Sequence, residues 1–422
     1  MDRRDIEIMA PAGSFECLQA AVQGGADAVY FGVGRLNMRA HSAGNFTAGE
    51  LDEVVSRCHH AGCKAYLTLN IVLYDAELPE MRATLEAAQR AGVDAVIASD
   101  MAVILACRAI GMPVHISTQL NVSNYEALAF YAQFADVVVL ARELGLDQVR
   151  DIHEAALRAN LRGPSGAPVR LEMFAHGALC MAVSGKCYLS LHSSGASANR
   201  GSCYQICRRS YEVSDAETGE RLHIDNAYIM SPKDLCTIEF LQRMLDSGVR
   251  VLKIEGRARS AEYVERCTRL YRAAADAVCA GRYSPELAQD YKRQLAEVFN
   301  RGFWDGYYQG ARLGEWSAVY GSQATRRKVY CGKVSNWFDR IDVAEITVEA
   351  VPLVRGDTLL AIGPTSGVTE WTATDIRVDF QPCARVEKGQ RCSVAVPVGE
   401  GREHLRRGDK VYVWRETETT NE

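Results

Sequence analysis

Short apolar runs alternate with amphipathic segments along the first 160 residues, and this alternation predicts the fold. Aliphatic and β-branched runs predict strands at 6–10, 28–32, 65–70, 95–98, 114–117 and 137–141. Segments with helical spacing of apolar positions separate them, at 14–24, 47–61, 77–91, 101–110 and 125–133. Strands that alternate with helices in this way indicate parallel βαβ units.

Two later strand-like runs, at 171–174 and 251–254, bring the set to eight, and a helical segment follows at 261–280. Eight strand–helix units predict a TIM-like (β/α)8 barrel, which belongs to the α/β class and forms a catalytic domain at 1–280. A doubly wound sheet would show the same periodicity and stays an alternative. The long passage between the last two strands, about 175–240, is then an insertion into the barrel.

The pattern changes after the predicted barrel. An aromatic and glycine-rich stretch at 281–325 is typical of a helical or aromatic linker. From residue 326 the chain consists of short alternating segments separated by turn residues. This pattern predicts a small C-terminal β-barrel domain at 326–422.

Five cysteines in and just after the insertion suggest a metal site: Cys180, Cys187, Cys203, Cys207 and Cys236. Thiolates bind zinc and iron–sulfur clusters because sulfur is a soft ligand that donates charge. Only one pair, at 203 and 207, has the close spacing typical of structural zinc, so the scattered arrangement favours a 4Fe–4S cluster. The alternatives are that these cysteines are small buried apolar residues, or that they form disulfides.

The residues around these cysteines resemble the peptidase U32 family. The resemblance extends from residue 10 to about 308 and is carried by Glu172-x-Phe174-x-His176-Gly-Ala-Leu-Cys180-x-x-x-Ser184-Gly-x-Cys187, Asn199-Arg-Gly-x-Cys203-x-x-x-Cys207-Arg, Lys233-Asp-Leu-Cys236 and Lys253-Ile-Glu-Gly-Arg257. It implies hydroxylation without molecular oxygen, with a 4Fe–4S cluster and with prephenate as the oxygen donor. The length and the C-terminal domain are most similar to the branch of the family that forms 5-hydroxyuridine at the wobble position of tRNA.

The resemblance also implies roles for particular residues. The expected cluster ligands are Cys180, Cys187, Cys203 and Cys236, with Cys207 as the alternative for one place. We expect His176 and Glu255 to move protons, and Arg257 or Lys253 to hold an acid. Substrate-binding residues are expected at the C-terminal ends of strands and beside the cysteines, where barrel active sites lie, namely Asn70, Gln119, Arg142, Arg200 and Arg208.

Composition says more about the cellular location of the protein than about its chemistry. The net charge of −5 gives no overall sign of a nucleic-acid partner. No stretch has the length of a membrane span, and no signal peptide is evident, so we expect a cytoplasmic protein. The resemblance to the U32 family implies tRNA and the iron–sulfur assembly machinery as partners. A U32-type peptidase and a non-catalytic RNA-binding protein with a structural cluster remain alternatives. The absence of His-Glu-x-x-His and Gly-x-Ser-x-Gly sequences counts against the peptidase.

Overall fold

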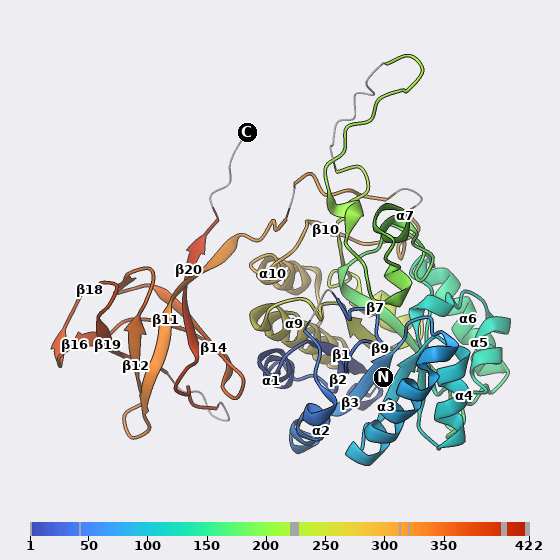
Figure 1. Ribbon diagram of the computed structural model, residues 1–422, viewed down its shortest axis with the longest axis horizontal. Coiled ribbons are helices and arrows are strands. Elements are labelled where there is room, and N and C mark those ends of the chain that lie inside the picture. Colours follow the sequence, from blue (N-terminus) through green and yellow to red (C-terminus); the bar gives the residue numbers. More distant parts are fainter. Residues whose placement is uncertain are drawn as a thin grey trace.

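The computed structural model describes residues 2–41, 44–219, 228–311, 314–319, 321–397 and 403–417. Its N-terminal part is a closed barrel of eight parallel strands surrounded by helices (Figure 1). The strands follow one another in chain order from β1 to β7, and β9 pairs with both β7 and β1. The predicted (β/α)8 barrel is therefore confirmed, and the doubly wound alternative is excluded because the sheet closes.

The barrel elements lie close to the predicted ranges. The strands are β1 (Glu7–Ala12), β2 (Ala28–Gly32), β3 (Lys64–Leu69), β4 (Ala95–Ala98), β5 (Val114–Ile116), β6 (Val137–Val139), β7 (Arg170–Ala178) and β9 (Val249–Ile254). The helices around them are α1 (Phe15–Gln23), α2 (Leu51–His60), α3 (Leu78–Ala91), α4 (Met101–Ala109), α5 (Tyr125–Tyr131), α6 (Leu146–Arg158), α8 (Leu241–Asp246) and α9 (Ala261–Cys279).

Local sequence explains where several of these helices begin and end. The side chains of Ser14, Asp100 and Asn124 each accept a hydrogen bond from a backbone N–H in the first turn of α1, α4 and α5. These caps satisfy N–H groups that have no partner within the helix. Helix α3 ends at Gly92, whose φ of +81° is a left-handed conformation that glycine adopts without strain.

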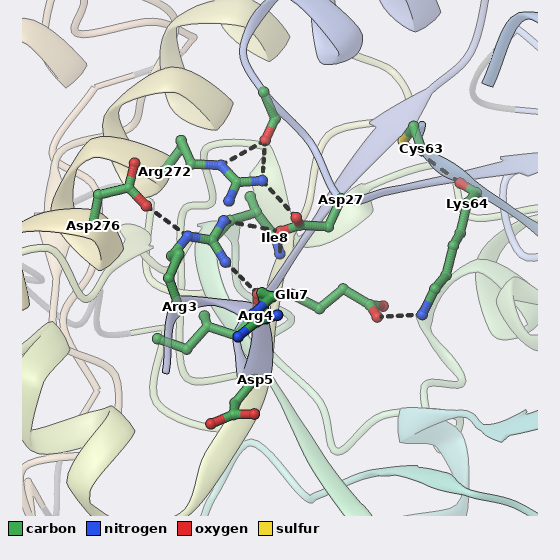
Figure 2. A network of polar contacts seen from close by, with 12 residues as sticks. Arg3, Arg4, Asp5, Glu7, Ile8, Asp27, Cys63, Lys64, Arg272 and Asp276 are labelled. Carbon is green, nitrogen blue, oxygen red and sulfur yellow. Dashed lines mark hydrogen bonds and ion pairs between the residues drawn. The ribbon is translucent and has the colours of Figure 1, made fainter. Parts of the chain in front are cut away.

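Ion pairs hold the N-terminal end of the barrel together, as Figure 2 shows. Arg3 contacts Asp276 at 2.6 Å and Asp27 at 3.2 Å, and Arg272 contacts Asp27 at 2.6 Å. These contacts join the start of the chain to β2 and to helix α9. The charges of these four side chains thus neutralise one another. The opposite end of the barrel carries the cavity described below.

The predicted insertion folds over the C-terminal end of the barrel. It contains the short helix α7 (Leu189–Ser194) and the strand β8 (Asp234–Cys236). Strand β8 runs antiparallel to the end of β7, with Cys236 opposite His176, and it also pairs with β10 (Phe303–Trp304). The inserted chain is therefore anchored to the barrel through the sheet itself.

A second unit follows α10 (Pro285–Leu295) and β10. Its eight-stranded antiparallel sheet has the order β15-β14-β20-β11-β12-β19-β16-β17 and surrounds a hydrophobic core of its own. Among the described residues the two outer strands, β15 and β17, do not pair with each other. The strands are β11 (Arg326–Phe338), β12 (Val343–Val348), β14 (Thr358–Gly363), β15 (Gly367–Thr372), β16 (Ile376–Val378), β17 (Gln381–Pro382), β19 (Arg391–Ala395) and β20 (Lys410–Glu416), with β13 (Leu353–Val354) and β18 (Arg385–Val386) forming a separate pair.

The two units contact each other through apolar and polar groups. The hydrophobic core cluster of the barrel also contains three residues of the C-terminal unit, Leu360, Val368 and Trp414. The side-chain amide of Gln23 in α1 donates to the Ser366 carbonyl at 2.7 Å and accepts from the Val368 N–H at 2.8 Å. Arg266 in α9 pairs with Glu370 in β15 at 3.0 Å. None of the described helices is both long enough and apolar enough to span a lipid bilayer.

Candidate functional site

A cavity of about 450 Å³ lies where the barrel strands end and the insertion covers them. Barrel residues such as Tyr30, Thr68 and Phe174 line one side, and residues of the insertion line the other. Active sites of TIM barrels lie at this end because the loops that follow the strands converge there. The position of the cavity agrees with the expected location of the site.

Four cysteines from the insertion line this cavity: Cys180, Cys187, Cys203 and Cys207. All four thiols are free. Burial raises the pKa of Cys187 and raises the pKa of Cys207 to about 11, which favours the protonated thiol at these two positions. A bound metal would displace those protons, since the thiolate is the ligand.

Cys236, one of the four expected ligands, lies apart from the cavity, whereas Cys207, the expected alternative, lines it. The Cys236 side chain is 3% exposed on β8 and does not line the cavity. The Tyr271 hydroxyl oxygen lies 3.9 Å from its Sγ atom, and burial raises the pKa of Cys236 to about 11. Spacing in the sequence did not separate Cys207 from Cys236, whereas the fold places Cys207 at the cavity and Cys236 in the packed interior.

The four cavity thiols lie near one another, since Cys180, Cys187 and Cys203 all help to raise the pKa of Cys207. Within the described part of the chain, no three His, Cys, Asp or Glu side chains are close enough to hold one metal ion. A zinc ion needs its ligands around one point at about 2.3 Å. In a 4Fe–4S cluster each of four thiolates binds a different iron, so the sulfur atoms stand farther apart. Four soft donors around one cavity therefore match the donor set of such a cluster.

Basic side chains outnumber acidic ones in the rest of the lining. Glu255 is the one carboxylate among the lining residues that the structure describes. Because the cavity has an excess of positive charge, it favours an anionic ligand. The basic lining residues are Arg39, Arg142, Arg208, Lys253, Arg257, Arg259 and Arg301.

Arg142 and Arg257 line the cavity and, among the described residues, have no ion pair with a carboxylate. Arg142 lies 3.7 Å from the Phe174 ring centroid, and its Nε is buried without a hydrogen-bond partner among the described residues. Arg257 donates to Thr68 at 3.0 Å and to Asn37 at 2.9 Å. Burial lowers the pKa of Arg257 to about 10, so it stays cationic at neutral pH. A guanidinium binds a carboxylate through two parallel hydrogen bonds.

Glu255 is the partner of Arg39, at 2.6 Å. Burial opposes ionisation of this carboxyl, but Arg39, Arg142 and Arg257 outweigh it and hold the pKa of Glu255 at about 2. An acid of that strength is a weak proton acceptor at neutral pH. The ion pair indicates that Glu255 orients Arg39, and its expected role in moving protons stays a prediction.

Lys253 lines the cavity and contacts the buried Glu172, with 2.8 Å between Nζ and Oε1. The ammonium also lies 4.8 Å from the centroid of the Tyr30 ring. Burial raises the pKa of Glu172 from its ordinary value. Lys253 is therefore at the cavity as expected, with a buried carboxyl behind it.

His176 does not line the cavity, in contrast to its expected catalytic role. It is 1% exposed and packs against the rings of Tyr263, Tyr271 and Phe303. Its Nδ1 lies 3.5 Å from the Tyr271 hydroxyl, and burial lowers the pKa of His176 to about 3. A neutral imidazole among aromatic rings indicates a packing role at the β7–β8 junction.

The other predicted binding residues divide into two groups. Asn70, Gln119 and Arg208 line the cavity together with Arg142. Arg200 points away from it and pairs with Glu77 at 2.8 Å. Arg39 was missed in the sequence because it lies in the loop after β2, several residues beyond the strand end where we expected binding groups.

Comparison with known proteins identifies the family. The family model described as "Peptidase family U32" matches residues 13–318. The chain belongs to peptidase family U32. Its cavity and four lining thiols all lie within the matched region.

Relatives of this U32 chain carry two kinds of name. A protein from Porphyromonas gingivalis named "Collagenase" is 55% identical over 412 residues, which cover 98% of each chain. "tRNA hydroxylation protein P1" from Bacillus subtilis is 32% identical over 367 residues, which cover 85% of this chain and 83% of that protein. A 23S rRNA 5-hydroxycytidine synthase from Escherichia coli is 35% identical over 320 residues, or 74% of this chain and 46% of that one. The family thus includes proteins named for RNA hydroxylation and proteins named as peptidases.

Proposed function

We propose that this U32 protein hydroxylates tRNA to 5-hydroxyuridine at the wobble position without molecular oxygen, using a 4Fe–4S cluster and prephenate as the oxygen donor. One observation carries the proposal: four free thiols and an excess of arginine side chains line the same cavity at the mouth of the barrel. A peptidase needs neither feature. An iron–sulfur enzyme that binds an organic acid needs both.

Cys180, Cys187, Cys203 and Cys207 are the residues that would hold the cluster. When bound, such a cluster supplies redox-active iron beside the substrate. Arg208, which also lines the cavity, donates to the Leu179 carbonyl at 2.6 Å and so fixes the chain next to Cys180. The protein's part is to keep the loops that carry these thiols in place over the barrel.

The remaining lining residues bind and orient the anion. Prephenate carries two carboxylates, and Arg142 and Arg257 are two cavity guanidinium groups without an ion-paired carboxylate among the described residues. Lys253 provides an ammonium next to them, and Glu172 behind it accepts from that ammonium on Oε1, which leaves Oε2 as the oxygen placed to hold a proton. Arg39, which is held by its ion pair with Glu255, adds a further positive charge from the loop after β2.

The relative from Bacillus subtilis supports tRNA as the substrate, because its name denotes tRNA hydroxylation and it is similar over most of its length. The relative named "Collagenase" supports a second candidate, a peptidase. The two candidates make opposite predictions for protein that lacks iron. A peptidase would still cleave a collagen-derived peptide after chelation, whereas the proposed hydroxylase would not cleave it in either state.

Mass spectrometry of tRNA nucleosides tests the proposal in cells. We expect a deletion strain to lose 5-hydroxyuridine and its derivatives, and the intact gene to restore them. Unchanged 5-hydroxyuridine levels in the deletion strain would refute the proposed function. If the deletion strain instead lost 5-hydroxycytidine from ribosomal RNA, the substrate would be ribosomal RNA, as for the rRNA-modifying relative.

A further inference from the structure

Exposed hydrophobic side chains gather around the mouth of the cavity. Of the fifteen large hydrophobic side chains that are exposed among the described residues, seven come from two short segments, 72–74 and 181–204. Scattered exposed hydrophobic residues are normal, but a concentration marks an interaction surface. We call this set the aromatic rim, and it consists of Val72, Tyr74, Met181, Val183, Tyr188, Leu191 and Tyr204.

Hydrogen bonds connect the two segments into one surface. The backbone N–H of Val72 donates to the Asn199 carbonyl at 3.1 Å. The N–H of Tyr204 donates to Oγ of Ser190 at 3.0 Å, which brings Tyr204 next to α7. Asn199 and Ser190 line the cavity, so the rim begins directly outside it.

Three tyrosines give the rim flat and accessible rings. Tyr74, Tyr188 and Tyr204 are 58%, 71% and 52% exposed. The guanidinium of Arg200 lies 3.7 Å from the centroid of the Tyr74 ring. The remaining face of that ring is available to a second planar group, which would extend the stack.

The part of the rim that lies in the insertion is locally basic, although the chain as a whole is acidic. Residues 181–210 contain four basic residues, Lys186, Arg200, Arg208 and Arg209, and no Asp or Glu, although the whole chain has a net charge of −5. Lys186 and Arg209 are exposed. This charge complements a polyanion, and exposed rings beside positive groups are the combination that binds single-stranded nucleic acid.

We infer that the aromatic rim binds the unpaired nucleotides of an RNA loop, with tyrosine rings stacking on bases and with Lys186 and Arg209 facing phosphates. This inference rests on the proposed function and names the part of the RNA that the protein recognises. Paired bases hide their faces inside the duplex, so a stem offers nothing for the rings to stack on. A base must also leave its stack to enter the cavity beneath the rim.

Fluorescence anisotropy tests the inference with full-length, anaerobically purified protein and a labelled, unmodified tRNA anticodon stem–loop. We expect Tyr74→Ala and Tyr188→Ala each to weaken binding about 10-fold, and the corresponding Phe variants to bind like wild type. Tyr74 is far in sequence from any cavity cysteine, so its variant separates RNA binding from cluster loss. Phe380→Ala is the control, because Phe380 is 92% exposed on the C-terminal sheet.

Three results would overturn the inference. They are binding of both Ala variants within about twofold of wild type, equal affinity for a fully paired RNA of the same length, and equal affinity for an acidic peptide. The assay is independent of the chemistry. If the Tyr variants lose RNA binding while a deletion strain keeps its 5-hydroxyuridine, the rim is an RNA surface and only the proposed hydroxylation fails.

Discussion

The hydroxyl oxygen of Tyr271 lies 3.9 Å from the sulfur of Cys236, inside the packed junction between α9 and β8. The same hydroxyl donates to the Ala175 carbonyl at 2.8 Å and so ties α9 to the last part of β7. Cys236 is therefore a small buried residue at a structural joint. Cys236 belongs to the family motif Lys233-Asp-Leu-Cys236, but its side chain does not line the cavity.

Substitution of the two rival cysteines should separate these roles. We expect Cys207→Ser to lower the iron and sulfide content of anaerobically purified protein well below about four atoms per chain, and Cys236→Ser to leave it unchanged. Iron and acid-labile sulfide assays measure both variants side by side. Loss of iron from Cys236→Ser with full retention in Cys207→Ser would restore the ligand set expected from the sequence.

Removal of a cavity arginine should weaken binding of a dicarboxylate. We expect Arg142→Met or Arg257→Met to raise the Kd for prephenate by about 10- to 100-fold, because a hydrogen bond to a charged group contributes about 1.5–3 kcal/mol. Isothermal titration calorimetry under anaerobic conditions provides the measurement. Arg293→Met is the control, since the Arg293 side chain is 72% exposed on α10. Unchanged affinity in both cavity variants would place the acid elsewhere.

Buried histidines should make the fold sensitive to mild acid. Burial lowers the pKa of both His115 and His176 to about 3, whereas an unfolded chain has a histidine pKa of about 6.5. Below pH 6.5 the unfolded state binds protons that the folded state does not, so stability is lost as the pH falls from 6.5 towards 3. Two such histidines contribute a slope of about 2.7 kcal/mol per pH unit near pH 5.

Urea unfolding at pH 7, 6 and 5 measures that slope. We expect His176→Gln to remove about half of the part due to these two histidines, since His115 is then the one of the pair that remains. Carboxyls such as Glu255, whose pKa is about 2, contribute stability that is lost only at lower pH. An unchanged pH slope in the variant would show that His176 is accessible to protons in the folded protein.

Gln23 makes two of the hydrogen bonds at the joint between the two units. Gln23→Ala removes two hydrogen bonds to the backbone of the C-terminal sheet, and we expect it to destabilise the protein by about 2 kcal/mol in urea unfolding. Gln89→Ala is a suitable comparison, because its exposed side chain makes a single bond to the Ile110 carbonyl. Equal effects of the two substitutions would mean that the two hydrogen bonds of Gln23 add no more to stability than a single exposed one.

The periodicity of the sequence was sufficient for the barrel but not for the site. Strands β2 and β4 lie at the predicted residues because each is a short apolar run between polar turns. Strand β8 was not predicted, since it has three residues and depends on a distant partner, β7. The assignment of Cys207 and Cys236 follows from that pairing, which no local pattern reveals. Arg39 reaches the cavity from a loop, where sequence periodicity carries no information.

We propose that the protein hydroxylates RNA in this cavity with an iron–sulfur cluster held by four thiols. Anaerobic incubation of cluster-loaded protein with unmodified tRNA and prephenate, followed by nucleoside mass spectrometry, tests it most directly. We expect 5-hydroxyuridine to form with the wild-type protein and not with the Cys207→Ser variant. Absence of product from protein that retains its iron, or equal product from the Cys207→Ser variant, would contradict it.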